Sequence, residues 1–170
     1  MNLLFDFTVD KATSTIHVTR EFAADLDLVW DAFTNAEILY KWMGPKPYRV
    51  QTKEMDFRVG GRWLYTMVSP ENVPLSRYSL AEFIEIQPKT SFTTKNSFSD
   101  ENGNHADSGF TFSITKNSFK AEGEKTTVHI SKKMQSLAQL EKFIELGFIE
   151  GTSAGMKNLD EYFLSLVTSK

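Results

Sequence analysis

The three histidines are the side chains of this sequence best suited to acid–base or metal chemistry, because imidazole titrates near neutral pH and binds transition metals. His17 and His129 each lie between two apolar residues in an alternating segment, so we expect both to point away from the core. His105 lies in a polar loop. A solvated structural role is therefore favoured over a catalytic role, and a metal site is the least supported.

Asp56 and Arg58 lie two residues apart on a predicted strand and so share a face. They form either an anion clamp beside a cavity or a structural ion pair next to the Gly60-Gly61 turn, and the ion pair is favoured. Arginine suits bidentate recognition of carboxylates, so Arg58 is the best polar candidate if a ligand carries an acid. The glycine pair matches no phosphate-binding loop, and the sequence has no nucleophile elbow.

Three glycines, Gly147, Gly151 and Gly155, recur at four-residue steps in a predicted C-terminal helix. Each costs a helix about 1 kcal/mol relative to alanine, so the stripe needs a compensating reason. Close packing of the helix on the sheet is favoured, and a ligand cavity beside the helix or a dimer contact are the alternatives. At Gly151, or failing that at Gly147, we expect open volume.

Large aromatic residues are abundant, with 14 Phe, 5 Tyr and 3 Trp, and such rings either fill a core or line a pocket. Two predicted strands each present three large apolar side chains on one face: Trp63, Tyr65 and Met67 on one, and Phe110, Phe112 and Ile114 on the other. Either set is more often plain core, but we expect some of these rings to border a pocket. Trp30, on a short amphipathic helix, is expected to be structural.

The elements that must position these residues follow from hydrophobic periodicity and turn chemistry. A hairpin of strands near 4–9 and 13–22 comes first, followed by two short helices. The first helix starts at Asp25, and Asn35 caps the second. Six further strands are predicted near 50–57, 62–68, 78–86, 91–98, 109–115 and 126–133, as an antiparallel meander. The capping-box pattern from Ser136 to Gln139 then starts a helix that is predicted to continue to the end of the chain.

This order of elements resembles the START-like or SRPBCC superfamily, and specific motifs strengthen the resemblance. They are VTREF at 18–22, VWDAFT at 29–34, WMGP at 42–45, MDFRVGGRW at 55–63, and Gly147 and Gly151 before Leu159. In this order they are similar to the activator of heat-shock-ninety ATPase homologue family over nearly the whole chain. The resemblance implies an α+β helix-grip fold, in which a curved antiparallel sheet wraps around a long C-terminal helix and leaves a ligand-sized cavity.

The chain departs from the family pattern at three positions. Asp25 and Ala36 stand where proline often begins each short helix, and both are compatible with a helix start. Met43 replaces a common second tryptophan and could reshape whatever Trp42 borders. The family motif contains no catalytic residue that transfers to this sequence.

Composition limits the remaining classes of function. The 170 residues suit one domain, spanning 1–170, and a formal charge of -3 without a basic run argues against nucleic acid as a partner. The N-terminus has no signal-peptide pattern and the composition is not that of a membrane-spanning chain, so we expect a cytoplasmic location. The absence of cysteine excludes thiol catalysis and thiolate metal sites.

These observations favour a protein that binds a small apolar or aromatic ligand without transforming it, as a monomer or homodimer, with no cofactor, no metal and no catalytic residue. A cyclase, lyase or hydrolase on the same fold is the first alternative. A co-activator of a chaperone ATPase, which the family name suggests, is the second. The candidate cavity residues are Trp42, Arg58, Trp63, Tyr65, Met67, Phe110, Phe112, Gly147, Phe148 and Gly151.

Overall fold

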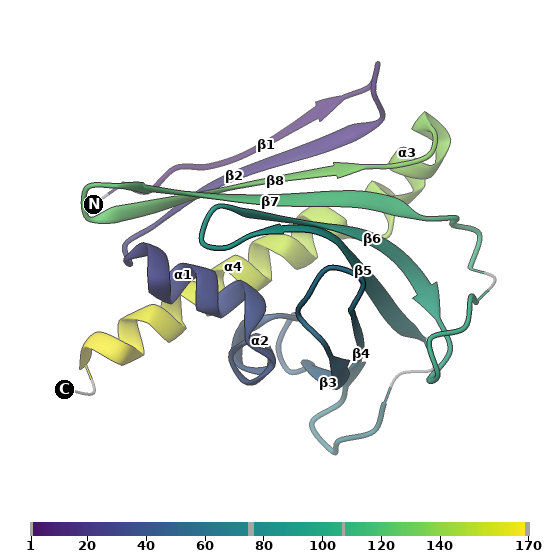
Figure 1. Cartoon of the computed structure of the whole chain (residues 1–170), viewed down its shortest axis with the longest axis horizontal. Coiled ribbons are helices and arrows are strands. Elements are labelled where there is room, and N and C mark those ends of the chain that lie inside the picture. Colours follow the sequence, from purple (N-terminus) through teal and green to yellow (C-terminus); the bar gives the residue numbers. More distant parts are fainter. Residues whose placement is uncertain (1, 75–76, 107, 169–170) are drawn as a thin grey trace.

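Among the residues that the structure describes, a single antiparallel sheet of eight strands forms the body of the fold (Figure 1). The computed structural model describes residues 2–74, 77–106 and 108–168. The strand order is β1-β2-β8-β7-β6-β5-β4-β3, so β3 to β8 form the predicted meander and the N-terminal hairpin extends it beside β8. The strands are β1 (Phe5–Asp10), β2 (Thr15–Phe22), β3 (Arg49–Met55), β4 (Arg62–Val68), β5 (Tyr78–Gln87), β6 (Ser91–Ser99), β7 (Ser113–Glu122) and β8 (Lys125–Lys133).

In the described part of the chain four helices accompany the sheet, namely α1 (Leu26–Thr34), α2 (Ala36–Trp42), α3 (Leu137–Glu145) and α4 (Phe148–Thr168). The predicted caps start the two short helices. Asp25 accepts a hydrogen bond from the Leu28 amide at 3.0 Å, and Asn35 accepts one from the Glu37 amide at 2.9 Å. In Figure 1, α1, α2 and α4 lie on the same side of the sheet, which they cover. No helix in the described part of the chain is long and apolar enough to span a bilayer.

The predicted C-terminal helix is two helices rather than one. Leu146 caps α3, and Gly147, with φ of +97°, separates it from α4. The apolar stripe continues across the break, so periodicity alone does not reveal it. The positive φ is a conformation that glycine adopts without the steric cost that other residues incur.

The predicted strand at 109–115 also begins later than expected. Residues 109–112 precede β7, which starts at Ser113 and continues to Glu122. Phe110 therefore does not share a strand face with Ile114. Instead it is buried against Phe98 of β6 and Phe143 of α3, with ring centroids 5.8 and 5.7 Å apart. The packing of an irregular segment on a distant helix thus replaces the strand pairing that was expected.

Strand alternation places every second side chain of β8 on the helix-covered face of the sheet, where these side chains form an inner row. The register between β8 and β2 aligns this row with the inner row of β2. Val128 is opposite Arg20, and Ile130 is opposite Val18. On β2, as predicted, Ile16, Val18, Arg20 and Phe22 are buried, while His17, Thr19 and Glu21 are only half-buried.

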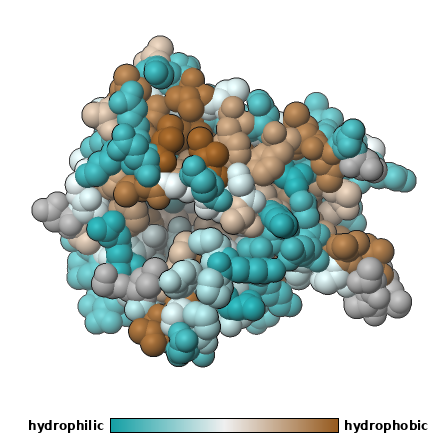
Figure 2. All heavy atoms as spheres, turned by 180° about the vertical axis from the view of Figure 1, so that it is seen from behind, coloured by the Kyte–Doolittle hydropathy of each residue, from teal (hydrophilic) through white to brown (hydrophobic). Residues whose placement is uncertain are grey.

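Beneath α1 this face is packed with aromatic rings. Trp30, which is 6% exposed, meets Phe57, Phe92 and Phe119 edge-on at centroid distances of 6.0, 5.8 and 5.1 Å. Seen from behind, the molecular surface is mostly hydrophilic, with hydrophobic side chains in separate groups (Figure 2). One group lies near the C-terminal end of α4, where Leu164 and Val167 are exposed.

Candidate functional site

A cavity of about 370 Å³ lies between the inner face of the sheet and the helices. Strands β3 to β8 line it on one side. On the other side it is lined by Phe33 of α1, by α2 and the segment after it, and by α3 and α4. A smaller cavity of about 100 Å³ adjoins it, and both are bordered by Tyr65, Asn96, Lys132 and Phe143. Most of the larger cavity's lining is apolar.

Most of the side chains predicted to border a cavity do so. The larger cavity is lined by Trp42, Trp63, Tyr65, Met67, Phe148 and Gly151. The smaller one is lined by Tyr65, Phe110 and Phe112. Met43, at the position where the family often has a second tryptophan, also lines the larger cavity.

Two of the cavity candidates, Arg58 and Gly147, lie outside both linings. The Arg58 side chain is 70% exposed, and its Nε donates a hydrogen bond to Asp56 Oδ2 at 2.8 Å. This is the structural ion pair that was the favoured interpretation. It lies beside a turn in which a Cβ on Gly61 would be 2.1 Å from the Asp56 carbonyl oxygen, so glycine is required there. Gly147 ends α3, and its role is that of a helix terminator.

The two glycines within α4 differ in what they face. A Cβ built on Gly151 would have no neighbouring atom within 4 Å, whereas a Cβ on Gly155 would lie 3.7 Å from Cζ3 of Trp42. Gly151 therefore borders open volume, as predicted. Gly155 allows close packing, but against α2 rather than against the sheet. Asn158 of α4 reinforces that contact by donating hydrogen bonds to the carbonyl oxygens of Trp42 and Gly44, at 3.2 and 3.0 Å.

Aromatic side chains form the rigid part of the cavity wall. The rings of Trp63 and Tyr65 on β4 are stacked, with centroids 3.8 Å apart. The indole nitrogens of Trp63 and Trp42 are satisfied within the protein, since they donate to Thr52 Oγ1 at 2.9 Å and to the Ala32 carbonyl oxygen at 2.8 Å. Because the polar atoms of these tryptophans are already bonded, the rings offer their apolar surface to the cavity.

A polar stripe crosses this otherwise apolar wall on the central strands. It comprises Thr94 and Asn96 on β6, and Thr115 and Asn117 on β7. Thr94 donates a hydrogen bond to Asn96 Oδ1 at 2.8 Å. Thr115 lies opposite Lys132 in the register of β7 and β8, so the stripe continues onto β8 as a charged residue.

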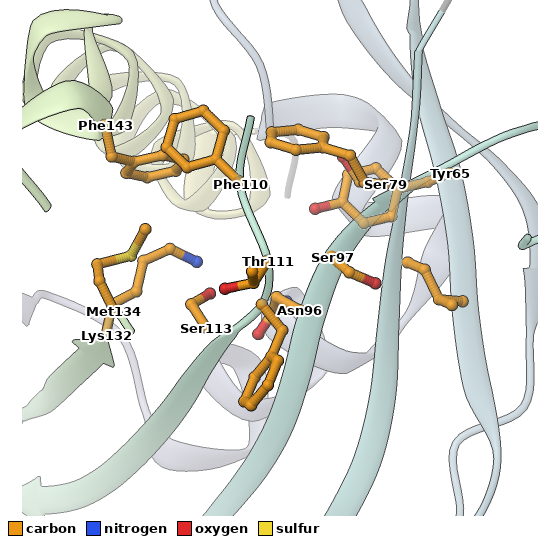
Figure 3. A pocket seen from close by; sticks show the side chains of 13 residues that line it. Tyr65, Ser79, Asn96, Ser97, Phe110, Thr111, Ser113, Lys132, Met134 and Phe143 are labelled. Carbon is orange, nitrogen blue, oxygen red and sulfur yellow. The ribbon is translucent and has the colours of Figure 1, made fainter. Parts of the chain in front are cut away.

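Lys132 is the functional candidate that the sequence interpretation missed. Among the described residues that line the two cavities, it is the only one with a charged side chain. Its Nζ donates a hydrogen bond to Thr115 Oγ1 at 3.3 Å and lies 5.2 Å from the centroid of the Phe143 ring. In Figure 3 its nitrogen points into the space that the lining side chains enclose.

Burial changes the protonation of two lining residues. Loss of hydration lowers the pKa of Lys132 to about 8. Burial raises the pKa of Tyr65, against the opposing effect of a hydrogen bond with Ser79. A signal for Lys132 was present in the sequence, because it is in phase with Val128, Ile130 and Met134 of the inner row. The same alternation places His129 on the outer face.

On that outer face the structure brings two histidines together. Nδ1 of His17 lies 3.2 Å from Nε2 of His129, and the half-buried rings are stacked. Both point away from the core, as predicted, but their proximity was not foreseen. Burial and the neighbouring His17 lower the pKa of His129. In the described part of the chain, these two belong to no group of three or more residues that could hold a metal ion.

Comparison with known proteins gives one family and many similar structures. A sequence model of the family described as Activator of Hsp90 ATPase homolog 1-like protein matches residues 23–164. No curated protein matches the chain.

Among solved structures, protein Ms6760 from Mycobacterium smegmatis is similar with a TM-score of 0.83 and 25% identity, over 95% of this chain and 96% of that one. A protein from Arthrobacter aurescens has a TM-score of 0.81 at 22% identity, over 91% and 88% of the two chains. A protein from Rhodobacter sphaeroides has a TM-score of 0.81 at 14% identity, over 95% and 99%. The likeness covers nearly all of each chain, and the fold is the START-like helix-grip fold.

Proposed function

The chain belongs to the family of Activator of Hsp90 ATPase homolog 1-like proteins, and from that premise we propose that it binds a small apolar or aromatic molecule in its internal cavity without transforming it. Proteins of this family and fold typically bind hydrophobic ligands. The observation that carries the proposal for this chain is the cavity of about 370 Å³ with a mainly apolar lining. Its size and lining are typical of small-molecule sites.

The shape of the lining supports a flat or elongated apolar ligand. The stacked rings of Trp63 and Tyr65 offer one apolar wall, and the bare backbone at Gly151 leaves room on the opposite side. A ligand between them would bury its surface against β4 and α4. These elements are held by main-chain pairing and by contacts with α2, so little ordering would be needed on binding.

The titratable groups of the lining favour binding over catalysis. Among the described lining residues these groups are Lys132 and Tyr65, and their hydrogen-bond partners are the neutral hydroxyl groups of Thr115 and Ser79. General acid–base catalysis most often uses an imidazole or a carboxylate, and neither kind of group borders the described lining. A lysine with a lowered pKa can also act as a base, but the hydrogen-bond partner of Lys132 is a neutral hydroxyl group rather than a second titratable group.

The test is binding of prodan, a neutral naphthalene dye whose emission shifts in apolar surroundings. We expect the wild-type protein to bind it and Gly151→Phe to lose binding, because the new ring would occupy the open volume. Lys157→Phe, on an exposed position of the same helix, is the matched control and should bind as the wild type does.

Native mass spectrometry of the purified protein, before and after denaturation, complements the dye and also gives the oligomeric state. A retained small molecule that is released on denaturation would support the proposal. Failure of the wild type to bind prodan, together with no retained molecule, would contradict it. A domain that acts through contacts with another protein, including a chaperone ATPase, would then be the better hypothesis.

A further inference from the structure

We propose that the ligand of the cavity carries a carboxylate, which pairs with the ammonium group of Lys132. This inference rests on the proposed function, since it names the chemical class of the molecule that the cavity binds. It is argued from the position of Lys132, from the charges around it and from the polar groups beside it.

Lys132 lies on the inner face of the sheet and is half-buried there. It continues the inner row of β8 formed by Val128 and Ile130, and main-chain register holds it opposite Ile16 of β2 on one side and Thr115 of β7 on the other. Its side chain keeps some accessible surface, and it lines both cavities. The ammonium group therefore sits where the two cavities adjoin.

No described acidic residue balances this cation. None of the ion pairs among the described residues includes Lys132, and neither cavity lining contains an aspartate or glutamate in the described part of the chain. A buried charge without a counter-ion is costly. At pH 7, a pKa of about 8 still leaves roughly nine in ten molecules charged, so the cost is present under ordinary conditions.

The surroundings of the ammonium group suit a single carboxylate. Thr115 already approaches Nζ, and Asn96 lines the same two cavities and can donate a further hydrogen bond through its amide. One cation matches one monoanion, whereas a phosphate dianion would keep an uncompensated buried charge. The apolar remainder of the ligand would lie in the larger cavity, between Trp63 and Gly151.

The test compares an anionic probe, naphthalene-2-acetate, with a neutral probe of the same shape, naphthalene-2-acetamide. Their affinities are measured by isothermal titration calorimetry at pH 7. We expect the wild type to bind the carboxylate about tenfold more tightly, or better, because a charge-assisted hydrogen bond is stronger than a neutral one. Lys132→Met should bind the two probes equally and should keep the affinity for the amide. Lys133→Met, on the exposed face of the same strand, is the matched control and should keep the preference.

A second measurement uses the unmodified protein. Between pH 7 and 9.5, loss of the Lys132 proton should weaken carboxylate binding about sevenfold for a tenfold preference at pH 7, given a pKa of about 8. Amide binding should not change, since the other titratable group of the described lining, Tyr65, has a pKa that burial raises above its ordinary value.

The outcomes separate the two proposals. Equal binding of both probes by the wild type, or a carboxylate preference that persists in Lys132→Met, would overturn the carboxylate inference and leave the apolar-ligand proposal standing. Binding of neither probe, nor of prodan, would overturn both.

Discussion

The inner face of the sheet is solid beneath α1 and hollow beneath α3 and the start of α4. At the solid end, Trp30 fills the space between helix and sheet and contacts three phenylalanine rings. At the hollow end, Gly151 faces the sheet with no atom within 4 Å of its Cβ position. The same scaffold thus uses a large side chain where it needs stability and no side chain where it leaves room for a ligand.

The two ends also treat a buried cation differently. Arg20, on the inner row of β2, is nearly buried and forms an ion pair with Asp160 of α4, while its guanidinium lies 5.1 and 4.9 Å from the ring centroids of Phe5 and Phe22. Lys132, on the inner row of β8, has a hydroxyl group and a ring as its neighbours. Pairing offsets part of the cost of burying Arg20 and Asp160, although burial still raises the pKa of Asp160. The unpaired Lys132 has no such offset, which favours a role in binding.

The largest expected effect contrasts two tryptophans, one from each end. Trp30→Ala should lower the free energy of unfolding by about 3–5 kcal/mol, because it opens a void in close-packed aromatic core. Trp63→Ala should cost clearly less, since the Trp63 ring already borders empty volume. Equilibrium denaturation by urea, monitored by far-ultraviolet circular dichroism, measures both. Equal losses would mean that the two ends are packed alike.

Removing the compensated cation should have the next largest effect. Arg20→Met should destabilise the protein by about 1–3 kcal/mol, because it leaves Asp160 without its partner. This expected loss of stability is small for a buried ion pair, because the Asp160 side chain is 41% exposed and water replaces part of the lost interaction. A stability equal to that of the wild type would show that the pair contributes nothing beyond the packing of its methylene groups.

The sequence predicted the solid end of the molecule well, because that end follows from local rules. Asp25 and Asn35 are capping residues that predict the starts of the two short helices. The alternation from Ile16 to Phe22 predicts the buried face of β2. Such features depend on residues a few positions apart. The cavity candidates on β4 were also found in this way, since Trp63, Tyr65 and Met67 share one strand face.

What the sequence did not reveal depends on contacts between distant segments. Phe110 leaves the expected strand because it packs on Phe143, more than thirty residues away. The break at Gly147 interrupts an apolar stripe that continues on both sides, so no local signal separated α3 from α4. The inner-row position of Lys132 makes it a ligand-binding candidate only because that part of the strand faces a cavity, and the sequence does not show whether the space there is empty or filled. Arg58 has the chemistry of an anion-binding residue, but it lies outside the cavity on an exposed turn.

Removing Lys132, the cation without a counter-ion, should change the free energy of unfolding in the opposite direction. Lys132→Met should raise the free energy of unfolding at pH 7 by up to about 3 kcal/mol, because a lowered pKa means that the folded state disfavours the charged form. Between pH 8 and 10.5 the unfolded lysine binds more protons than the folded one, so the wild type gains stability as pH rises. The advantage of the variant should therefore shrink across this window.

Urea denaturation of both proteins at pH 7 and at pH 10 measures this change. Comparing the two proteins cancels the contribution of Tyr65, which is present in both. An advantage that is absent at pH 7, or one that grows with pH, would show that the lysine is compensated in the folded protein.

The smallest effect tests the hollow end directly. Gly151→Ala adds a methyl group to open volume and improves helix propensity, so the free energy of unfolding should stay unchanged or rise by up to about 1 kcal/mol. Gly155→Ala gains the same propensity but brings its methyl group into contact with Trp42, so it is the matched control for a packed site on the same helix. Thermal and urea unfolding of both variants, with prodan binding measured alongside, compare the two sites.

Larger substitutions at Gly151 and Gly155 should separate the two sites more clearly. Gly151→Leu should remain folded and lose prodan binding, because the cavity accepts the added atoms in place of the dye. Gly155→Leu should cost about 1–3 kcal/mol by forcing Trp42 aside. If instead Gly151→Ala destabilised the protein as much as an overpacked core does, α4 would have to lie against the sheet, and the difference between the two ends of the molecule would disappear.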